Sequence, residues 1–140
     1  MTQLPYIRVG DIMRKDVHTV DPLASVRDAL HEMHKHGVSS LVIERRDERD
    51  ELGLIVVSDI ARDVIARNRS LDRVDVYEVM AKPVVTLDAD MDVKYASRLL
   101  SDLRLSRGLV VDHDRNLVGI VTLRDMVLAY TGPGGVEETI

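Results

Sequence analysis

The sequence has 140 residues, enough for one compact domain or two very small ones, and its 45% hydrophobic and 31% charged residues exclude a disordered or membrane-embedded chain. A net charge of -5 and an aromatic content supplied by four tyrosines argue against nucleic-acid binding, which needs a basic surface and stacking rings. The lack of cysteine excludes disulfides, thiolate catalysis and cysteine-ligated zinc.

The N-terminal residues 1–13 carry neither a basic leader region nor a long apolar run. A secretory signal begins with basic residues, and a membrane span needs about 20 apolar residues, so this segment predicts neither. We therefore expect a cytoplasmic protein with no membrane partner.

The chain contains two copies of one pattern. Thr86 follows Thr19 by 67 positions, and the same interval relates many like residues along the two halves. These pairs include Leu4 and Leu71, Val9 and Val76, Met13 and Met80, Lys15 and Lys82, Val17 and Val84, Asp21 and Asp88, Val26 and Val93, Ala29 and Ala96, and Ser39 and Ser106. After the charged residues 44–51 the interval becomes 66, because Asp125 follows Asp59 by that number. A length change is typical of a loop, so we expect this stretch to be a solvated turn.

In each copy a turn-like opening leads to a short extended piece, which ends near an aspartate just before a helix. Apolar residues spaced three and four positions apart then predict one apolar helical face. These residues are Val26, Ala29, Leu30 and Met33 in the first copy, and Val93, Ala96, Leu100 and Leu103 in the second. Gly37 is typical of a residue that ends a helix, so we expect the first helix to stop there.

Two runs of branched apolar residues follow each helix and predict a pair of buried strands. The runs are residues 38–44 and 52–57 in the first copy, and 105–111 and 116–122 in the second. Second helices begin at Ser58 and at Thr122. The predicted unit is therefore β-α-β-β-α, used twice in an α/β (α+β) fold.

One such unit cannot cover its own sheet, whereas two stacked units bury a common core. We place the first repeat at residues 4–67 and the second at residues 71–130. The glycine-rich residues 131–140 predict a flexible tail.

Three motifs in these elements resemble a known family. They are V-x-T in each extended piece, the strand LSRGLVVD at residues 105–112, and G-h-h-T-x-x-D at residues 119–125, where h is apolar. With the openings DIM and EVM, they resemble the cystathionine-β-synthase (CBS) domain used in tandem as a Bateman module. The resemblance covers roughly residues 4–130, and it rests on the order, spacing and duplication of the motifs.

The resemblance implies that the two repeats pack sheet to sheet with pseudo-twofold symmetry. Members of the family bind adenine nucleotides or related adenosyl ligands in clefts between the repeats and use them to regulate attached or partner proteins. It therefore implies a regulatory sensor rather than an enzyme, with AMP, ADP or ATP as ligand and NAD or S-adenosylmethionine as alternatives. No metal is required. The resemblance also implies a homodimer and an unknown protein effector. A structural or dimerisation module without a functional ligand is the alternative.

Thr122 and Asp125 are the first candidates for the ligand site. An ionised Asp125 accepts two hydrogen bonds, which suits adjacent ribose hydroxyls, and Thr122 lies beside it on the helix. The helix start would also present N–H groups to a phosphate. The same two residues match a capping box, and the two interpretations are compatible. Gly119 lets the backbone approach closely. The resemblance places Val85 and Thr86 against adenine.

The strand before this step supplies further candidates. Arg107 offers a charge-assisted contact to phosphate, with Ser106 beside it. Gly108 and Leu109 leave a slot for a flat base. Arg124 contacts phosphate or faces solvent, and the sequence leaves both open.

The first copy departs from this pattern. Val56 takes the place of Thr122, and Ser40 takes the place of Arg107, so a hydroxyl and a cation are missing. Ser58 offers a hydroxyl that can cap the helix instead. The two losses would cost about 2 to 4 kcal/mol of ligand binding if nothing compensates. We therefore predict a weaker second site in the first copy. Its residues are Asp59, Thr19, Ser39 and Ser40.

The stretch HEMHKHG, residues 31–37, resembles the zinc motif HExxH, but His31 and His34 are three apart rather than four. At 100° per residue these side chains and His36 do not converge on one ion. We therefore predict no metal site and a solvated helix surface, with a weak two-histidine surface site as the remaining alternative. The sequence contains no recognisable motif for a catalytic nucleophile, so we predict no catalytic residues.

Overall fold

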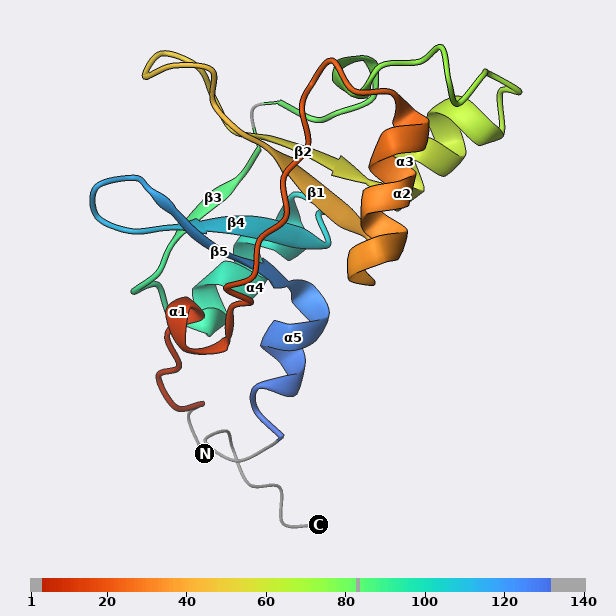
Figure 1. The fold of residues 1–140 in the computed structure, drawn as a ribbon. Coiled ribbons are helices and arrows are strands. Elements are labelled where there is room, and N and C mark those ends of the chain that lie inside the picture. The colour runs from red at the N-terminus through yellow and green to blue at the C-terminus, as the bar shows by residue number, and fades with distance from the viewer. Residues whose placement is uncertain (1–3, 83, 132–140) are drawn as a thin grey trace. The chain divides into compact units, whose positions relative to one another are not determined.

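The computed structural model describes residues 4–82 and 84–131, which form two compact units (Figure 1). The central unit runs from His18 to Val84. The split unit combines the residues up to Val17 with those from Val85 onward. The opening of each sequence copy is therefore built into the unit that holds the sheet of the other copy. The predicted flexible tail lies, apart from Thr131, outside the described residues.

Each unit holds a small sheet and helices, so the predicted α/β fold is confirmed. The central unit contains α2 (Val26–His36), β1 (Ser40–Ile43), β2 (Gly53–Val56), α3 (Val57–Ile60), the π-helical turn η1 (Ala61–Ile65) and the 3-10 turn η2 (Val76–Glu78). The split unit contains α1 (Val9–Ile12), β3 (Thr86–Asp88), α4 (Val93–Asp102), β4 (Arg107–Val111), β5 (Leu117–Thr122) and α5 (Leu123–Leu128).

The sheets follow the predicted order. In the split unit β3 pairs with β4 in parallel, and β4 pairs with β5 antiparallel. In the central unit β1 and β2 form an antiparallel pair. The first extended piece of the first copy makes a single parallel bridge, between Thr19 and Val42, where the second copy forms the strand β3.

The boundaries of α2 follow from its terminal residues. The Ser25 hydroxyl accepts a hydrogen bond from the Asp28 amide at 3.1 Å, which satisfies one of the free N–H groups at the helix start. Gly37 ends the helix with φ of 64°, a left-handed conformation that costs glycine little. The predicted stop at Gly37 is confirmed.

The core of each unit lies between its sheet and its helices. In the split unit β3, β4 and β5 contribute Leu87, Val110 and Val121, which pack with buried residues of α4 and α5. The central unit has the equivalent arrangement, in which the buried residues of α2, β1 and β2 are Val26, Ala29, Met33, Leu41, Ile43 and Ile55. Because side chains alternate along a strand, each sheet has a second face whose side chains are directed away from this core.

The exchanged openings reach the sheets through matching contacts. Arg14 bridges Ile120 in the split unit, and its amide donates to the Ile120 carbonyl at 2.8 Å. Ala81 bridges Leu54 in the central unit, with the same bond at 2.8 Å. These positions are related by the sequence repeat, so each unit extends its sheet in the same way.

Residues 44–51 connect β1 to β2 and are mostly exposed, as the sequence indicated. Asp50 is the exception, because its side chain is only 10% exposed and lies 2.8 Å from the ammonium of Lys82. No helix among residues 4–82 and 84–131 is long and apolar enough to cross a membrane.

Candidate functional site

Several of the sequence-predicted residues share one face of the sheet in the split unit. Arg107 is the Cα partner of Thr122, and Thr86 is the Cα partner of Leu109. Residues directly opposite each other on paired strands lie on the same face, and positions two apart on one strand do so as well. These four residues therefore occupy one face, while the core residue Val110 lies on the other.

Thr122 ends β5 and caps α5. Its side-chain oxygen accepts a hydrogen bond from the Asp125 amide at 3.1 Å. The Leu123 amide donates to the Ser106 carbonyl at 2.7 Å. Two of the N–H groups that the sequence analysis assigned to a phosphate are therefore engaged inside the chain. The predicted cap by the Thr122 side chain is confirmed, which is one half of the capping box, and the hydroxyl hydrogen can still be donated to a ligand.

The Asp125 carboxylate is half-buried and has a cationic neighbour that the sequence analysis missed. Its side chain is 20% exposed, and its Oδ2 atom accepts a hydrogen bond from Arg14 Nε at 3.3 Å. Arg14 belongs to the opening of the first copy, and the second copy has Ala81 at that position. The difference between Arg14 and Ala81 at equivalent repeat positions was the sequence signal that Arg14 has a role in one unit only.

Gly119 explains how Arg14 reaches this position. A Cβ atom at Gly119 would lie 2.5 Å from Met13 Sδ and 2.8 Å from the Arg14 carbonyl oxygen. The close backbone approach predicted at Gly119 is therefore the approach of the exchanged opening segment. This approach holds the backbone of Arg14 against β5, and from there the Arg14 side chain reaches Asp125.

Arg107 begins β4 and is half-buried. Its Nε atom donates to the Ser106 hydroxyl at 3.4 Å, so the two predicted neighbours are in contact. Burial lowers the pKa of the Arg107 guanidinium below its ordinary value. Arginine titrates so high that the group remains a cation, and its partial desolvation strengthens any contact with an anion.

Gly108 does not face the same way as Arg107. A Cβ atom at Gly108 would lie 3.1 Å from Leu87 Cδ1 and 3.6 Å from Leu100 Cδ2, which are core atoms. The missing side chain therefore makes room for the core, and the slot for a base that we attributed to Gly108 is not formed by that glycine. Leu109 is buried on the face that it shares with Arg107.

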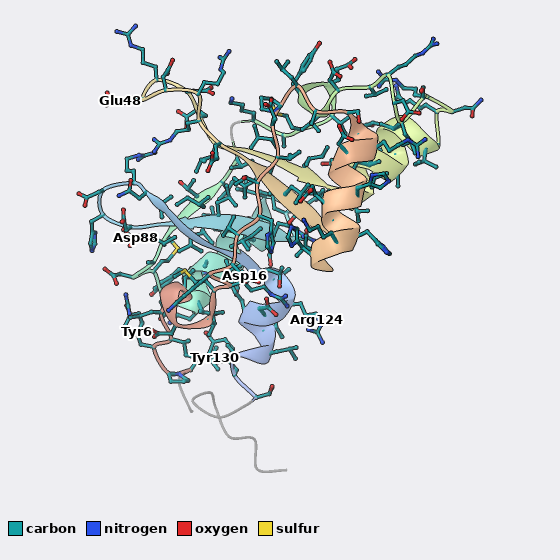
Figure 2. All side chains as sticks on the ribbon, in the orientation of Figure 1. Tyr6, Asp16, Glu48, Asp88, Arg124 and Tyr130 are labelled. Carbon is teal, nitrogen blue, oxygen red and sulfur yellow. The ribbon has the colours of Figure 1, made fainter. Side chains whose placement is uncertain are left out.

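The remaining candidates of the split unit lie near these residues along the chain. Val85 and Thr86 are half-buried at the start of β3, and the Val85 carbonyl accepts a hydrogen bond from the Leu109 amide at 3.1 Å. The Val85 carbonyl is thus used by the sheet. Arg124 is exposed in the first turn of α5 (Figure 2).

The central unit has the same arrangement with different side chains. Ser40 and Val56 are Cα partners, as Arg107 and Thr122 are in the split unit. The Val57 amide donates to the Ser39 carbonyl at 2.9 Å, which reproduces the contact between Leu123 and Ser106. Thr19 bridges Val42 and therefore lies on this same face.

The start of α3 lacks a side-chain cap. Within the described part of the chain, the N-cap residue of α3 is Val56, whose side chain makes no capping hydrogen bond. Ser58 lies inside the helix, so the prediction that it caps α3 in place of a threonine is wrong. Asp59 is 23% exposed, and its Oδ1 atom lies 3.1 Å from Arg62 Nη2. A cation from η1, the turn that continues α3, therefore pairs with this carboxylate, where Arg14 pairs with Asp125.

The histidines of α2 do not converge. His36 Nε2 lies 3.2 Å from Glu32 Oε2, and the His36 ring stacks on His18 at 3.7 Å between centroids. His31 and His34 are exposed. A different group that could hold a metal is Asp88, Asp90 and His113, each offering one ligand atom within 4.8 Å of the others. All three are exposed, and Asp90 already pairs with Arg8.

Both halves of the chain have a helix, two strands and a second helix in the same order, with an aspartate in the first turn of that second helix. The model of the CBS domain family matches residues 9–66 and 76–132. The chain therefore belongs to the CBS domain family, as a tandem pair of these domains.

A curated relative, the uncharacterized protein MK0525 of Methanopyrus kandleri, is 34% identical over 122 residues. The match covers 86% of this chain and 61% of that protein. For the uncharacterized protein MJ1232 of Methanocaldococcus jannaschii the covered share of the relative is 42%. The chain thus spans about half the length of these relatives.

Two solved structures are similar over most of this chain. The hexameric CBS-CP12 protein from bloom-forming cyanobacteria is 31% identical with a TM-score of 0.84, over 87% of this chain and 67% of that one. The CBS domain pair of protein MJ0100, in complex with 5′-methylthioadenosine and S-adenosylmethionine, is 32% identical with a TM-score of 0.74. That match covers 88% of this chain and 94% of the other.

Proposed function

We propose that this CBS pair is a sensor that binds an adenosyl ligand and signals its occupancy to a protein effector. The observation that carries the proposal is the shared sheet face of Thr86, Arg107 and Thr122, with Asp125 in the first turn of α5. The similar CBS pair of MJ0100 is known in complex with two adenosyl ligands, which supports the ligand class. AMP, ADP, ATP and NAD remain in the proposed set.

The residues of the split unit suit such a ligand. An adenosyl ligand presents a ribose diol, which a carboxylate accepts, and Asp125 is partly accessible for this contact. Its partner Arg14 is 61% exposed, and an ion pair of that kind contributes about 0 to 1 kcal/mol, so a ligand can displace or share it cheaply. Arg107 and Arg14 are the proposed partners of an anionic group on the ligand.

The central unit is proposed to bind more weakly. Its sheet face has Ser40 and Val56 in place of the guanidinium and the hydroxyl. Asp59 is engaged by Arg62 from η1, the turn that follows α3. Fewer charge-assisted contacts are available, and each is worth roughly 1.5 to 3 kcal/mol.

Thermal unfolding with AMP, ADP, ATP, NAD, S-adenosylmethionine and 5′-methylthioadenosine tests the proposal. A ligand at about 100 times its dissociation constant adds about 2.7 kcal/mol to the free energy of unfolding, a shift of several degrees. Asp125→Ala should abolish most of the shift, and the matched variant Asp59→Ala should reduce it much less. No shift with any of these ligands contradicts the proposal, and equal effects of the two variants contradict the ranking of the sites.

The signalling role requires that the ligand favour one of two conformations or assemblies. We propose no catalytic role, and incubation with each nucleotide followed by analysis for products checks this point. Any turnover that Asp125→Ala abolishes would show that the chain is an enzyme.

An interaction module without a functional ligand is the second candidate. The observation that favours it is a row of exposed apolar side chains, Tyr95 and Leu99 on α4 and Leu103 at its C-cap, spaced four residues apart. We propose that this row contributes to a homodimer. Light scattering tests the idea, because Leu99→Glu should lower the measured mass to that of a monomer and Asp102→Glu should not. A wild-type protein that is already monomeric excludes it.

A further inference from the structure

A cavity of about 930 Å³ lies within the central unit, and of the residues proposed for the weaker adenosyl site only Thr19 lines it. Three segments line it: residues 19–23 before α2, the loop from β1 to β2, and the chain around and after η2. The lining residues are Thr19, Val20, Asp21, Pro22, Leu23, Glu44, Arg46, Asp50, Tyr77, Met80 and Lys82. Its volume falls within the range of small-molecule sites, roughly 300 to 1,000 Å³.

The register of β1 and β2 separates the cavity from the Asp59 position. Ile43 pairs with Gly53 at the end of the sheet where the 44–51 loop begins, and Ser40 pairs with Val56 at the opposite end. Asp59 follows Val56, whereas the cavity includes three residues of the loop. The two places therefore lie at opposite ends of the same pair of strands.

A cationic group is built into one side of the cavity. The Asp50 carboxylate accepts hydrogen bonds from Lys82 Nζ at 2.8 Å, from the Arg46 amide at 2.9 Å and from Arg46 Nε at 3.2 Å. One carboxylate thus holds two cations, which leaves an excess positive charge. Asp50 is nearly buried, whereas the Arg46 side chain is 77% exposed, so its guanidinium remains accessible to a ligand anion.

The other cavity-lining charges are negative. Asp21 and Glu44 both line the cavity and are exposed. Asp21 uses Oδ1 to accept the Leu23 amide at 2.8 Å, which leaves its second oxygen for a ligand. A purely anionic molecule such as a nucleotide would meet these two carboxylates as well as the two cations, so its electrostatic fit is poor.

Apolar groups complete the lining. Leu23 and Tyr77 are exposed although they are large and apolar, and the half-buried Met80 and Pro22 lie beside them along the chain. Exposed apolar side chains gathered at a concave surface are typical of a ligand site. The cavity therefore offers a cation, carboxylates and an apolar surface together.

We propose that this cavity is a binding site for a small zwitterion with an apolar body, of the class of α-amino acids with apolar side chains. The ligand carboxylate pairs with Arg46 and Lys82, and the ligand ammonium pairs with Glu44 and Asp21. The apolar side chain packs against Tyr77, which supplies a large contact area with few rotatable bonds. Water fills the remaining volume at the open side.

Titration of the isotope-labelled protein, followed through its backbone amide NMR signals, tests this site. The probes are L-leucine, L-methionine and L-phenylalanine, compared with N-acetyl-L-leucine, which lacks the ammonium, and L-leucinamide, which lacks the carboxylate. We expect the three amino acids to shift signals of residues 19–23 and 44–50 and of Tyr77, and to leave Thr122 and Asp125 unshifted. Each analogue should bind about tenfold more weakly, because it loses one charge-assisted contact.

Variants separate the two charged contacts. Arg46→Gln should weaken L-leucine about tenfold and leave L-leucinamide unchanged, and Glu44→Gln should weaken L-leucine and leave N-acetyl-L-leucine unchanged. Arg49→Gln is the matched control, because Arg49 is exposed in the same loop and does not line the cavity. Each variant's amide spectrum confirms that it is folded.

Two results would overturn the proposal. One is that the three amino acids shift none of the cavity residues at millimolar concentration. The other is that both analogues bind as well as L-leucine, which would show that the charged groups do not contribute. Because no probe is an adenosyl compound, the result is independent of the function proposed for the split unit.

Discussion

Arg107 and Thr122 face each other across β4 and β5 as Cα partners, and Ser40 and Val56 hold the equivalent partner positions across β1 and β2. Ser40 and Val56, the two positions at which the first copy differs from the second in the sequence, are therefore neighbours in the fold. They replace a guanidinium and a hydroxyl on one face of the sheet, where the last strand of the unit leads into a helix.

The caps of α5 and α3 give a first prediction. Thr122→Val removes the side-chain oxygen that accepts the Asp125 amide, so the free energy of unfolding should fall by about 1 kcal/mol. Val56→Thr places a hydroxyl where α3 has no side-chain cap within the described residues, and it should raise the free energy of unfolding by a fraction of that amount. Urea denaturation measures both changes.

Thr122→Ser is the control for this pair, because serine retains the capping oxygen and should lose much less stability than valine. If Thr122→Val and Thr122→Ser are equally destabilised, the hydroxyl of Thr122 does not stabilise α5 and the prediction is contradicted.

The close approach at Gly119 gives a second prediction. Gly119→Ala would place a Cβ atom 2.5 Å from Met13 Sδ and 2.8 Å from the Arg14 carbonyl oxygen. The sulfur can move, but the carbonyl belongs to backbone that bridges Ile120, so the opening segment must shift. We expect a loss of roughly 1 to 3 kcal/mol in the free energy of unfolding.

Gly53→Ala is the matched variant at the equivalent position of the first copy. Its Cβ would lie 3.3 Å from Ile43 Cβ and from Met80 Sδ, which is tight but leaves room for adjustment. The loss of stability in urea should therefore be clearly smaller than at Gly119. Equal losses would show that the Arg14 carbonyl does not limit the space beside Gly119.

The Asp50 ion pair predicts a pH dependence of stability. The hydrogen bond from Lys82, followed by that from the Arg46 amide, holds the pKa of Asp50 far below its ordinary value. The unfolded chain takes up the Asp50 proton first, near pH 4, so this contribution to stability is complete above that pH and is lost as the pH falls below it. Lys82→Met should raise the pKa of Asp50 and reduce the loss of stability in acid.

A carbon NMR titration of the Asp50 carboxyl group measures its pKa directly, and urea denaturation between about pH 3 and pH 7 measures the stability. Lys15→Met is the matched control, because Lys15 is the repeat equivalent of Lys82 and is exposed. An ordinary pKa for Asp50 in the wild-type protein would contradict the ion pair.

The order of elements was predictable from the sequence because each unit repeats the same apolar periodicity, and the local stop at Gly37 depends on one residue's conformation. The exchange of the opening segments was not predictable in this way. It depends on the bridges of Arg14 to Ile120 and of Ala81 to Leu54, which join residues far apart in the chain. No periodicity along the sequence encodes such pairings.

The candidate site shows the same limit. Thr122 and Asp125 were identifiable because a hydroxyl and a carboxylate three positions apart are a local pattern. The face of β4 toward which Gly108 is directed depends on the strand register. The ion pairs of Arg14 with Asp125 and of Arg62 with Asp59 depend on how the chain folds, the first of them on the exchange of the opening segments. Ser58 was wrongly expected to cap α3 because the sequence alone does not fix the first helical residue.

The last prediction transfers the ligand-binding side chains from one unit to the other. Ser40→Arg combined with Val56→Thr gives the central unit the guanidinium and the hydroxyl of the split unit at the same partner positions. If these groups determine affinity for an adenosyl ligand, the double variant in an Asp125→Ala background should regain binding. The expected gain is about tenfold or more over Asp125→Ala alone, because one charge-assisted contact is worth roughly 1.5 to 3 kcal/mol.

Isothermal titration calorimetry with the ligand that gives the largest thermal shift measures this gain. Ser40→Gln with Val56→Thr is the control, because glutamine fills similar space without the charge. The pairing of Arg62 with Asp59 opposes the transfer, since that carboxylate must exchange one partner for the ribose. Adding Arg62→Gln should therefore increase the affinity further, whereas an unchanged affinity in all these variants would mean that the sheet face does not carry the binding site.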